Sequence, residues 1–336
     1  MANKTKKESV FSKIFSIDEM GVIIPLIAII LLTEIVLFLK GSDGHFVSAN
    51  NLLGMYQTIP FIVVIALGAA FPLMTGNVDI STGRVAGLGG IITALLASQH
   101  GLHWIPCVLI SLVICAVVGF INGLLVVKLN IPDFIATMAT LNICGAVRYI
   151  ILPKGIIDIP LTGLDNFKVA NIGGAWNILG LQYQFWVMII FLIIAYFMIK
   201  KTMWGRRMLA VGDNREVAAM AGINVSSMRL QAYVISACLA CISGVLTTIS
   251  YQKGIPAIGD GWEFKAIAGC VVGGVSLSGG KASALGIFLG VSLIWIAQSA
   301  LIFIGLPTIL NAAVQGVVMA AAVMYETLRE RRKIKA

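Results

Sequence analysis

Long apolar runs alternate with short polar segments along almost the whole chain. A helix needs about 20 mostly apolar residues to cross the hydrocarbon core of a bilayer. With that length as the criterion, ten spans are expected, at 21–39, 59–75, 85–99, 104–127, 132–152, 184–200, 229–250, 264–278, 283–304 and 307–325. The pattern predicts an all-α fold, a polytopic membrane helical bundle of about ten transmembrane helices, which forms a single transmembrane domain over residues 1–336.

The composition excludes a water-soluble globule. Apolar residues make up 59% of the 336 residues, charged residues only 12%, and the mean hydropathy is +0.96, whereas soluble domains carry about 25% charged residues. The net charge of +9 comes from residues between the apolar runs, which favours a lipid bilayer as partner over nucleic acid. The first span is too long for a signal-peptide core and lacks a small-residue cleavage site, so we expect it to be retained.

The positions of lysine and arginine predict the orientation, because these residues favour cytoplasmic loops. With ten spans, eighteen of the 24 fall on one side: Lys4, Lys6, Lys7, Lys13, Arg84, Lys128, Lys200, Lys201, Arg206, Arg207, Arg215, Arg229, Lys281, Arg329, Arg331, Arg332, Lys333 and Lys335. The opposite loops hold Lys40, Lys154, Lys168 and Lys253, and Arg148 and Lys265 lie within or at the edge of spans. Both the N-terminal segment 1–20 and the basic tail 326–336 are therefore expected to be cytoplasmic.

Six cysteines all lie in apolar stretches, where cysteine acts as a small hydrophobic residue. Cys238 and Cys241 form a C-x-x-C pair, but the three histidines, His45, His100 and His103, are distant in sequence. We therefore interpret the pair as helix packing in preference to a redox or metal site. No nucleophile–base pair has workable spacing either, so neither a catalytic residue nor a metal ligand is predicted.

The chain contains an internal repeat. Val78–Arg84, followed by Leu88-Gly89, matches Val275–Lys281, followed by Leu285-Gly286, at an offset of 197 positions. Both copies lie between two apolar spans, and with ten spans both face the same side. Parallel repeats of this kind are built into many transport proteins.

The glycines and serines of the repeat are expected to interrupt helices. Non-helical backbone near a membrane is tolerated only where protein buries it or water reaches it. One interpretation is a pair of broken-helix elements beside a polar translocation path or gate, with candidate residues Asp79, Ser81, Gly83, Ser276 and Ser278. The alternative is that the glycines only permit tight turns and close helix contacts.

The second copy is not a phosphate-binding loop. Gly279-Gly280-Lys281 is suggestive, but Val275 stands where that motif needs glycine and Ala282 where it needs a hydroxyl. The chain is therefore expected to hold no ATP or Mg²⁺ of its own, and any hydrolysis would fall to another subunit.

Two polar segments break the hydrophobic pattern. The external one, around 153–183, is either a connector or a lid facing an outside partner. In the internal one, 200–228, Asp213 or Asn214 can cap a short helix that Glu216 favours and Gly222 ends. This predicts a two-turn helix parallel to the membrane that fits a groove on a partner protein; a solvated cytoplasmic loop is the alternative.

The internal segment resembles the coupling loop of ABC importer permeases, in the spacing Glu-x-Ala-Ala-x-x-Gly at Glu216, Ala218, Ala219 and Gly222. More narrowly, Gly212, Asn214 and Gly222-Ile223-x-Val225 are similar to the ribose-type simple-sugar permeases. The resemblance covers about 45–325 and includes Asp79-Ile80-Ser81 with Gly83, Asn122-Gly123, Phe134-Ile135, Thr137, Ala266-Ile267-Ala268, Gly273-Gly274, Ser276 and Gly279-Gly280. Asp213 and Asn77 stand where that family usually has glycine, and Asn77 argues against a plain pentose or hexose.

The resemblance implies a multi-pass inner-membrane permease. Its partners would be a second permease chain, identical or paralogous, cytoplasmic ABC ATPase subunits that bind ATP and Mg²⁺, and an extracytoplasmic substrate-binding protein. The ATPase-docking residues carried over by position are Gly212, Asp213, Asn214, Glu216, Ala218, Ala219 and Gly222. Asn77 and Phe134 join the candidate path.

The leading hypothesis is an ABC permease subunit that moves a small polar solute, most simply a monosaccharide, by alternating access, without enzymatic activity. Within this class the alternatives are a nucleoside, an autoinducer-like sugar derivative or a branched-chain amino acid. An ion-coupled secondary transporter would need titratable groups in mid-membrane. Its candidates are Glu34, Asp79, Asp133, Arg148 and Lys265, which form a sparse proton relay.

Overall fold

The computed structural model describes residues 20–41, 44–153, 155–159 and 181–307, with single positions between 310 and 324. Residues 1–19, the tail 326–336, most of the expected span 307–325 and most of the external stretch 153–183 lie outside the described residues. The described helices are α2 (Met20–Leu39), α3 (Ala49–Met74), α4 (Thr82–Gln99), α5 (Trp104–Val127), α6 (Asp133–Ile151), α7 (Tyr183–Lys201), α8 (Met203–Asp213), α9 (Arg215–Met220), α10 (Val225–Tyr251), α11 (Trp262–Val272) and α12 (Ala284–Phe303).

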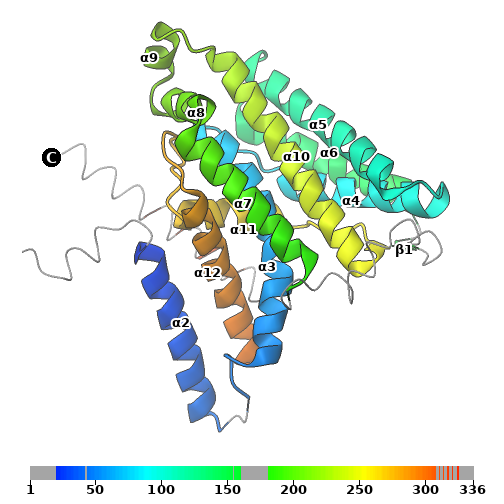
Figure 1. Ribbon diagram of the computed structural model, residues 1–336, viewed down its shortest axis with the longest axis vertical. Helices are drawn as coiled ribbons and strands as arrows, with labels where there is room; N and C mark the ends of the chain where they lie inside the picture. Colours follow the sequence, from blue (N-terminus) through cyan, green and yellow to red (C-terminus); the bar gives the residue numbers. More distant parts are fainter. Residues whose placement is uncertain are drawn as a thin grey trace, which may run out of the picture.

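The helices form a membrane bundle, as the apolar pattern predicts (Figure 1). Seven described helices are long and apolar enough to cross a bilayer: α2, α3, α5, α6, α7, α10 and α12. The total of ten spans stays a prediction. The expected span 264–278 is wrong in its length, because α11 ends at Val272 and Gly274 follows with a φ of +84°, a conformation that glycine adopts without steric cost.

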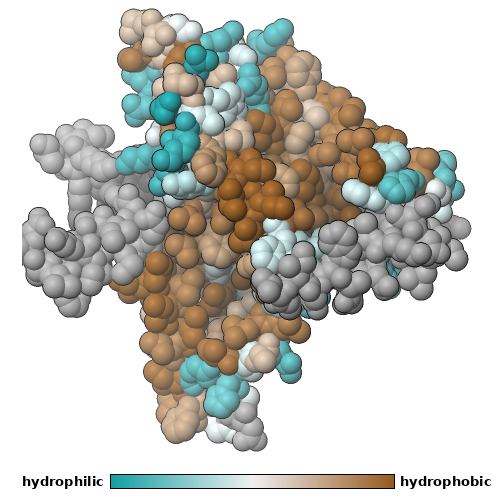
Figure 2. Space-filling model, in the orientation of Figure 1, coloured by the Kyte–Doolittle hydropathy of each residue, from teal (hydrophilic) through white to brown (hydrophobic). Residues whose placement is uncertain are grey.

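The core of the bundle is built around α3, α4 and α10. Every residue of α3 from Pro60 to Met74 is buried, and α4 packs against both α5 and α10. The outer helices instead expose large apolar side chains, among them Leu31, Val113 and Ile143. Figure 2 shows this apolar surface across the middle of the molecule, with hydrophilic residues gathered at the α8–α9 end. Such a surface suits contact with lipid.

Small residues allow the central helices to approach closely. A Cβ on Gly244 of α10 would overlap the Ala86 carbonyl oxygen of α4, and one on Gly89 would lie 2.6 Å from the Cys241 sulfur. Close backbone contact of this kind drives helix association in membranes, where the hydrophobic effect contributes little. Cys241, one half of the C-x-x-C pair, thus lies in a helix-packing contact.

A short sheet, absent from the all-α prediction, joins two connections. Strand β1 (Ile157–Asp158) pairs antiparallel with β2 (Lys253–Gly254), so that Ile157 faces Gly254. The pairing joins residues 157–158, near the beginning of the segment 153–183, to the connection that follows α10.

The glycine contact between α4 and α10 yields a first prediction. Gly244→Ala forces its methyl group into the backbone of α4, and overpacking of this kind costs about 1–3 kcal/mol. We expect a lower thermal unfolding midpoint for the detergent-solubilised protein. The matched control is Gly54→Ala on α3, where no atom lies within 4 Å of the added Cβ. Equal midpoints for the two variants would contradict the close contact.

Candidate functional site

The first repeat loop, residues 75–81, connects α3 to α4 without helical structure. It leaves the helix at Gly76, whose φ of +66° is strained for any residue with a Cβ. Asn77, Asp79 and Ser81 are nevertheless buried, with Asp79 only 1% exposed. Because the loop is buried, its polar groups need partners inside the protein.

Asp79 receives a hydrogen bond on each carboxylate oxygen. The Ser81 hydroxyl and backbone N–H donate to Oδ1 at 2.6 and 3.0 Å, and the Ser236 hydroxyl of α10 donates to Oδ2 at 2.8 Å. Ser236 lies eleven residues after Val225, the first residue of α10, which is about 16 Å along the helix axis. That rise is about half of a 30 Å hydrocarbon core, so the carboxylate lies well inside the bundle.

The hydrogen bonds continue from Asp79 to two further helices. Asn122 of α5 donates to the Ser81 hydroxyl at 3.0 Å and accepts from the Thr140 hydroxyl of α6. The backbone N–H of Ile80 donates to Thr137 of α6 at 3.3 Å. The first repeat loop is therefore fastened to α5, α6 and α10 at once.

The beginning of this loop is held by charged residues. Asp133, the first residue of α6, accepts from the Val78 N–H at 2.7 Å and from the Asn77 side-chain amide at 3.2 Å. The positive end of the α6 dipole favours a carboxylate there. The Asn77 oxygen accepts from Arg229 Nε at 2.9 Å and from Arg215 Nη2 at 3.3 Å.

The second repeat loop, residues 273–283, connects α11 to α12 and touches the first. The Gly280 N–H donates to the Met74 carbonyl at 3.2 Å, and a Cβ on Gly76 would lie 2.9 Å from the Ser278 carbonyl oxygen. The two copies of the repeat therefore meet at the same end of the bundle, as the sequence predicts. Ser276 is buried, and Ser278 is exposed.

The short helix predicted in the polar segment 200–228 is present as α9. Asn214 caps it by accepting from the Glu216 and Val217 N–H groups at 2.9 and 3.1 Å. Gly222 follows its end with a φ of +79°. Ala218 points inward and is 3% exposed, whereas Val217 and Met220 are 55% and 80% exposed. In Figure 1, α9 lies at one end of the molecule, beyond α8.

The junction of α8 and α9 lies against both repeat loops. A Cβ on Gly212 would overlap the Met74 carbonyl oxygen and would lie 2.5 Å from the Gly280 nitrogen. Three segments distant in sequence, the two repeat loops and the α8–α9 junction, therefore share one backbone contact.

The candidate path residues are only partly brought together. Asn77, Asp79 and Ser81 share the polar network, whereas Phe134 has its side chain 52% exposed on α6, and Ser276 and Ser278 lie in the second loop. Gly83 packs instead against the Gly259 carbonyl and Glu263.

The ion-coupling candidates do not form a relay within the described residues. Glu34 accepts from the Val47 N–H near the end of α2, and Arg148 pairs with Asp260 at 2.5 Å. Asp79 and Asp133 each bind separate donors around the first repeat loop.

A second cluster of charged residues surrounds the buried Arg148, and the apolar pattern of the sequence did not predict it. Arg148, fully buried, donates to the Ile258 carbonyl at 2.7 Å, and Arg84 Nε lies 3.4 Å from the Asp260 carboxylate. Gly87 and Gly145 leave room for the two guanidinium groups. The cluster fastens α4 and α6 to the connection before α11, and the only sequence signal was an arginine inside an apolar span.

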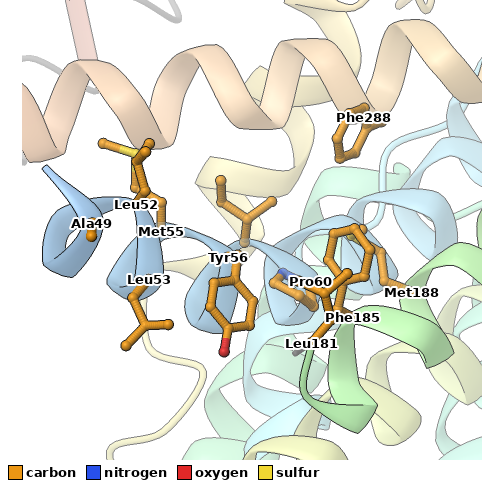
Figure 3. A pocket seen from close by; sticks show the side chains of 11 residues that line it. Ala49, Leu52, Leu53, Met55, Tyr56, Pro60, Leu181, Phe185, Met188 and Phe288 are labelled. Carbon is orange, nitrogen blue, oxygen red and sulfur yellow. The ribbon is translucent and has the colours of Figure 1, made fainter. Parts of the chain in front are cut away.

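An apolar cavity of about 490 Å³ lies at the opposite end of α3 from the repeat loops. Figure 3 shows side chains of its lining, which come from α3, α7, α12 and Leu181, two residues before α7. Among these lining residues only Tyr56 carries a side-chain polar group, so the cavity offers little to a hydroxylated solute. No group of three or more His, Cys, Asp or Glu in the described chain could hold a metal ion.

Residues 51–323 match the family described as the permease component of the branched-chain amino acid transport system. The chain belongs to this family. Membership confirms the prediction of a transport permease without enzymatic activity of its own.

Several curated relatives resemble the chain over most of its length. The autoinducer 2 import system permease protein LsrC of Shigella flexneri is 30% identical, over 90% of this chain and 85% of the relative. The L-arabinose ABC transporter permease protein AraH of Azospirillum brasilense is 27% identical, over 91% of this chain and 89% of the relative. The ribose import permease protein RbsC of Bacillus subtilis is 29% identical, over 90% of this chain and 91% of the relative. No solved structure gives a significant match.

Asp79→Asn tests the role of the deep carboxylate in this permease. The amide replaces one accepting oxygen with a donor, which leaves a buried hydroxyl unsatisfied and costs about 1–3 kcal/mol of unfolding free energy. We expect a lower unfolding midpoint than for Asp158→Asn, a control at an exposed acid, and slower transport. Unchanged transport kinetics would contradict a role in the path and leave the loop a structural turn.

Proposed function

We propose that this permease is the membrane subunit of an ATP-driven ABC importer and that it carries a monosaccharide or a close derivative. The observation that carries the proposal is the set of relatives above, whose names give autoinducer 2, L-arabinose and ribose as their cargo. Their similarity extends over at least 90% of the chain, so it includes both repeat loops and the α8–α9 segment.

The buried polar groups in and around the first repeat loop support a neutral, hydroxylated cargo. Ser81, Asn122, Thr140 and Ser236 offer hydroxyl and amide groups, which can both donate to and accept from a polyol. An amino acid would need partners for two opposite charges. A branched-chain amino acid, which the family description names, and a nucleoside remain the alternative cargoes.

The proposed mechanism is alternating access driven from the cytoplasm. The exposed face of α9 docks on an ABC ATPase subunit, which binds ATP and Mg²⁺, while Gly212 and the α9 caps fix the position of α9 against the bundle. An extracytoplasmic binding protein delivers the solute, and a second permease chain, identical or paralogous, completes the path. The basic residues of the α8–α9 segment support a cytoplasmic position for this end and for both termini in the inner membrane.

Reconstitution tests the proposal. The purified permease, combined in proteoliposomes with the ABC ATPase and the binding protein encoded near it, should accumulate ribose or L-arabinose when ATP is supplied. Without the ATPase it should accumulate neither sugar, in the presence or absence of a proton gradient. Uptake by the permease alone would refute the proposal. ATP-dependent uptake restricted to leucine or a nucleoside would show that the cargo is that compound and not a sugar.

Substitutions in α9 test the docking role. Glu216→Ala removes an exposed carboxylate from the first turn, and Gly222→Ala forces alanine into the left-handed region at a cost of about 1–2 kcal/mol. We expect both variants to insert normally, with solute-stimulated ATP hydrolysis and uptake largely lost. Ser226→Ala, at an exposed position on α10, is the control. Normal uptake in both α9 variants would remove the docking assignment.

A further inference from the structure

Arg215 is the first residue of α9, yet its side chain bonds to a segment outside α8 and α9. Its Nη2 lies 3.2 Å from the Thr75 carbonyl oxygen, 3.0 Å from the Gly76 carbonyl oxygen and 3.3 Å from the Asn77 side-chain oxygen. All three acceptors belong to the first repeat loop, about 140 positions earlier in the chain. The exposed helix α9 is therefore bonded directly to the loop that carries Asp79.

Arg215 binds directly beyond the C-terminal end of α3, at the C-cap Thr75 and the next residue, Gly76. The last carbonyls of a helix lack intrahelical partners and carry the negative end of the helix dipole. The last turn of α3 contains no basic residue of its own. Arg215 supplies the missing cation from a distant segment, which gives the contact an electrostatic as well as a geometric basis.

The contact continues toward the buried carboxylate through a short series of bonds. Asn77 accepts from Arg215 and donates to Asp133, and Asp133 also accepts from the N–H of Val78. Asp79 is the next residue. A displacement of the Arg215 guanidinium therefore acts on the backbone beside Asp79 through groups that are all hydrogen-bonded.

Other arginines of the cytoplasmic helix pair provide a contrast. Arg206 donates to the Met203 sulfur of its own helix, and Arg207 is exposed on α8. The positive charge of this segment alone does not explain why Arg215 reaches the repeat loop.

We propose that Arg215 is a positioning residue that transmits movement of α9 to the first repeat loop during transport. The inference rests on the proposed function, because it requires an ATPase that displaces α9. The close contact of Gly212 with Gly280 carries the same movement to the second repeat loop, so the two loops shift together.

Arg215→Gln and Arg215→Lys test the proposal in the complete complex of permease, ATPase and binding protein, with Arg207→Gln as the matched control. The glutamine variant should co-purify with the ATPase and keep its basal hydrolysis, while sugar accumulated per ATP falls about tenfold, within the range of allosteric coupling energies. Lysine keeps the positive charge at the end of α3 but lacks the planar guanidinium group with its several N–H donors. The lysine variant should therefore restore part of the sugar accumulated per ATP. Arg207→Gln should match the wild type.

Each outcome bears on the inference. An Arg215→Gln complex with the wild-type ratio of uptake to hydrolysis overturns it, while wild-type uptake still supports the proposed function. Loss of co-purification would make Arg215 a docking residue instead, and absence of ATP-driven uptake in the wild type would refute both claims. Should the glutamine variant fail to insert, the lysine variant decides, because an unchanged ratio there contradicts a role for the guanidinium fork.

The partner of Arg215 provides a second, independent measurement. Asn77→Ala removes one acceptor of the contact, together with the bonds of Asn77 to Arg229 and Asp133. Residues in one hydrogen-bonded network give non-additive effects in double-mutant cycles. The double variant Asn77→Ala, Arg215→Gln should lower the ratio of uptake to hydrolysis no further than Arg215→Gln alone. If the ratio of uptake to hydrolysis in the double variant fell by the product of the two single losses, the residues would act separately. That result would overturn the transmission route through Asn77.

Discussion

Backbone that leaves a helix inside a packed helical bundle must find its hydrogen-bond partners within the protein, because neither water nor lipid reaches it there. This constraint determines the organisation of the first repeat loop. Its N–H groups are taken by Asp133, Thr137 and Asp79, and the carbonyls at the end of α3 are taken by Arg215 and Gly280. Groups that complete the loop come from α5, α6, α9, α10 and the second repeat loop, so the loop cannot move independently of them.

The same constraint explains how a chain with few charged residues uses them. Arg148 and Arg84 meet Asp260, Asp133 lies at a helix N-terminus, and Asp79 accepts two hydroxyl groups. In each case the charge joins segments that come from different parts of the sequence. The polar residues thus help to determine which helices lie together, in addition to the close glycine contacts between α4 and α10.

The sequence predicted the helices and the short α9 well because both depend on local signals: apolar length, an asparagine cap and a glycine stop. It also located the repeat, since two copies can be compared with each other. It missed the reach of Arg215, the Ser236 contact and the Arg148–Asp260 pair. These join residues more than 100 positions apart, and nothing in the local pattern distinguishes Arg215 from Arg207. The extent of α11 was overestimated because the apolar run continues past Gly273, where the backbone turns.

Two kinds of contact join the helices α8 and α9 to the repeat loops, and they have complementary mechanical properties. The glycine contact at Gly212 is steric, so it resists compression and gives no resistance when the surfaces separate. The hydrogen bonds of Arg215 are attractive and resist separation. A conformational cycle needs the loops to follow α9 in both directions, and neither contact alone provides that. If α9 docks on an ATPase as proposed, their combination at one junction couples the loops to α9 whether it moves toward them or away from them.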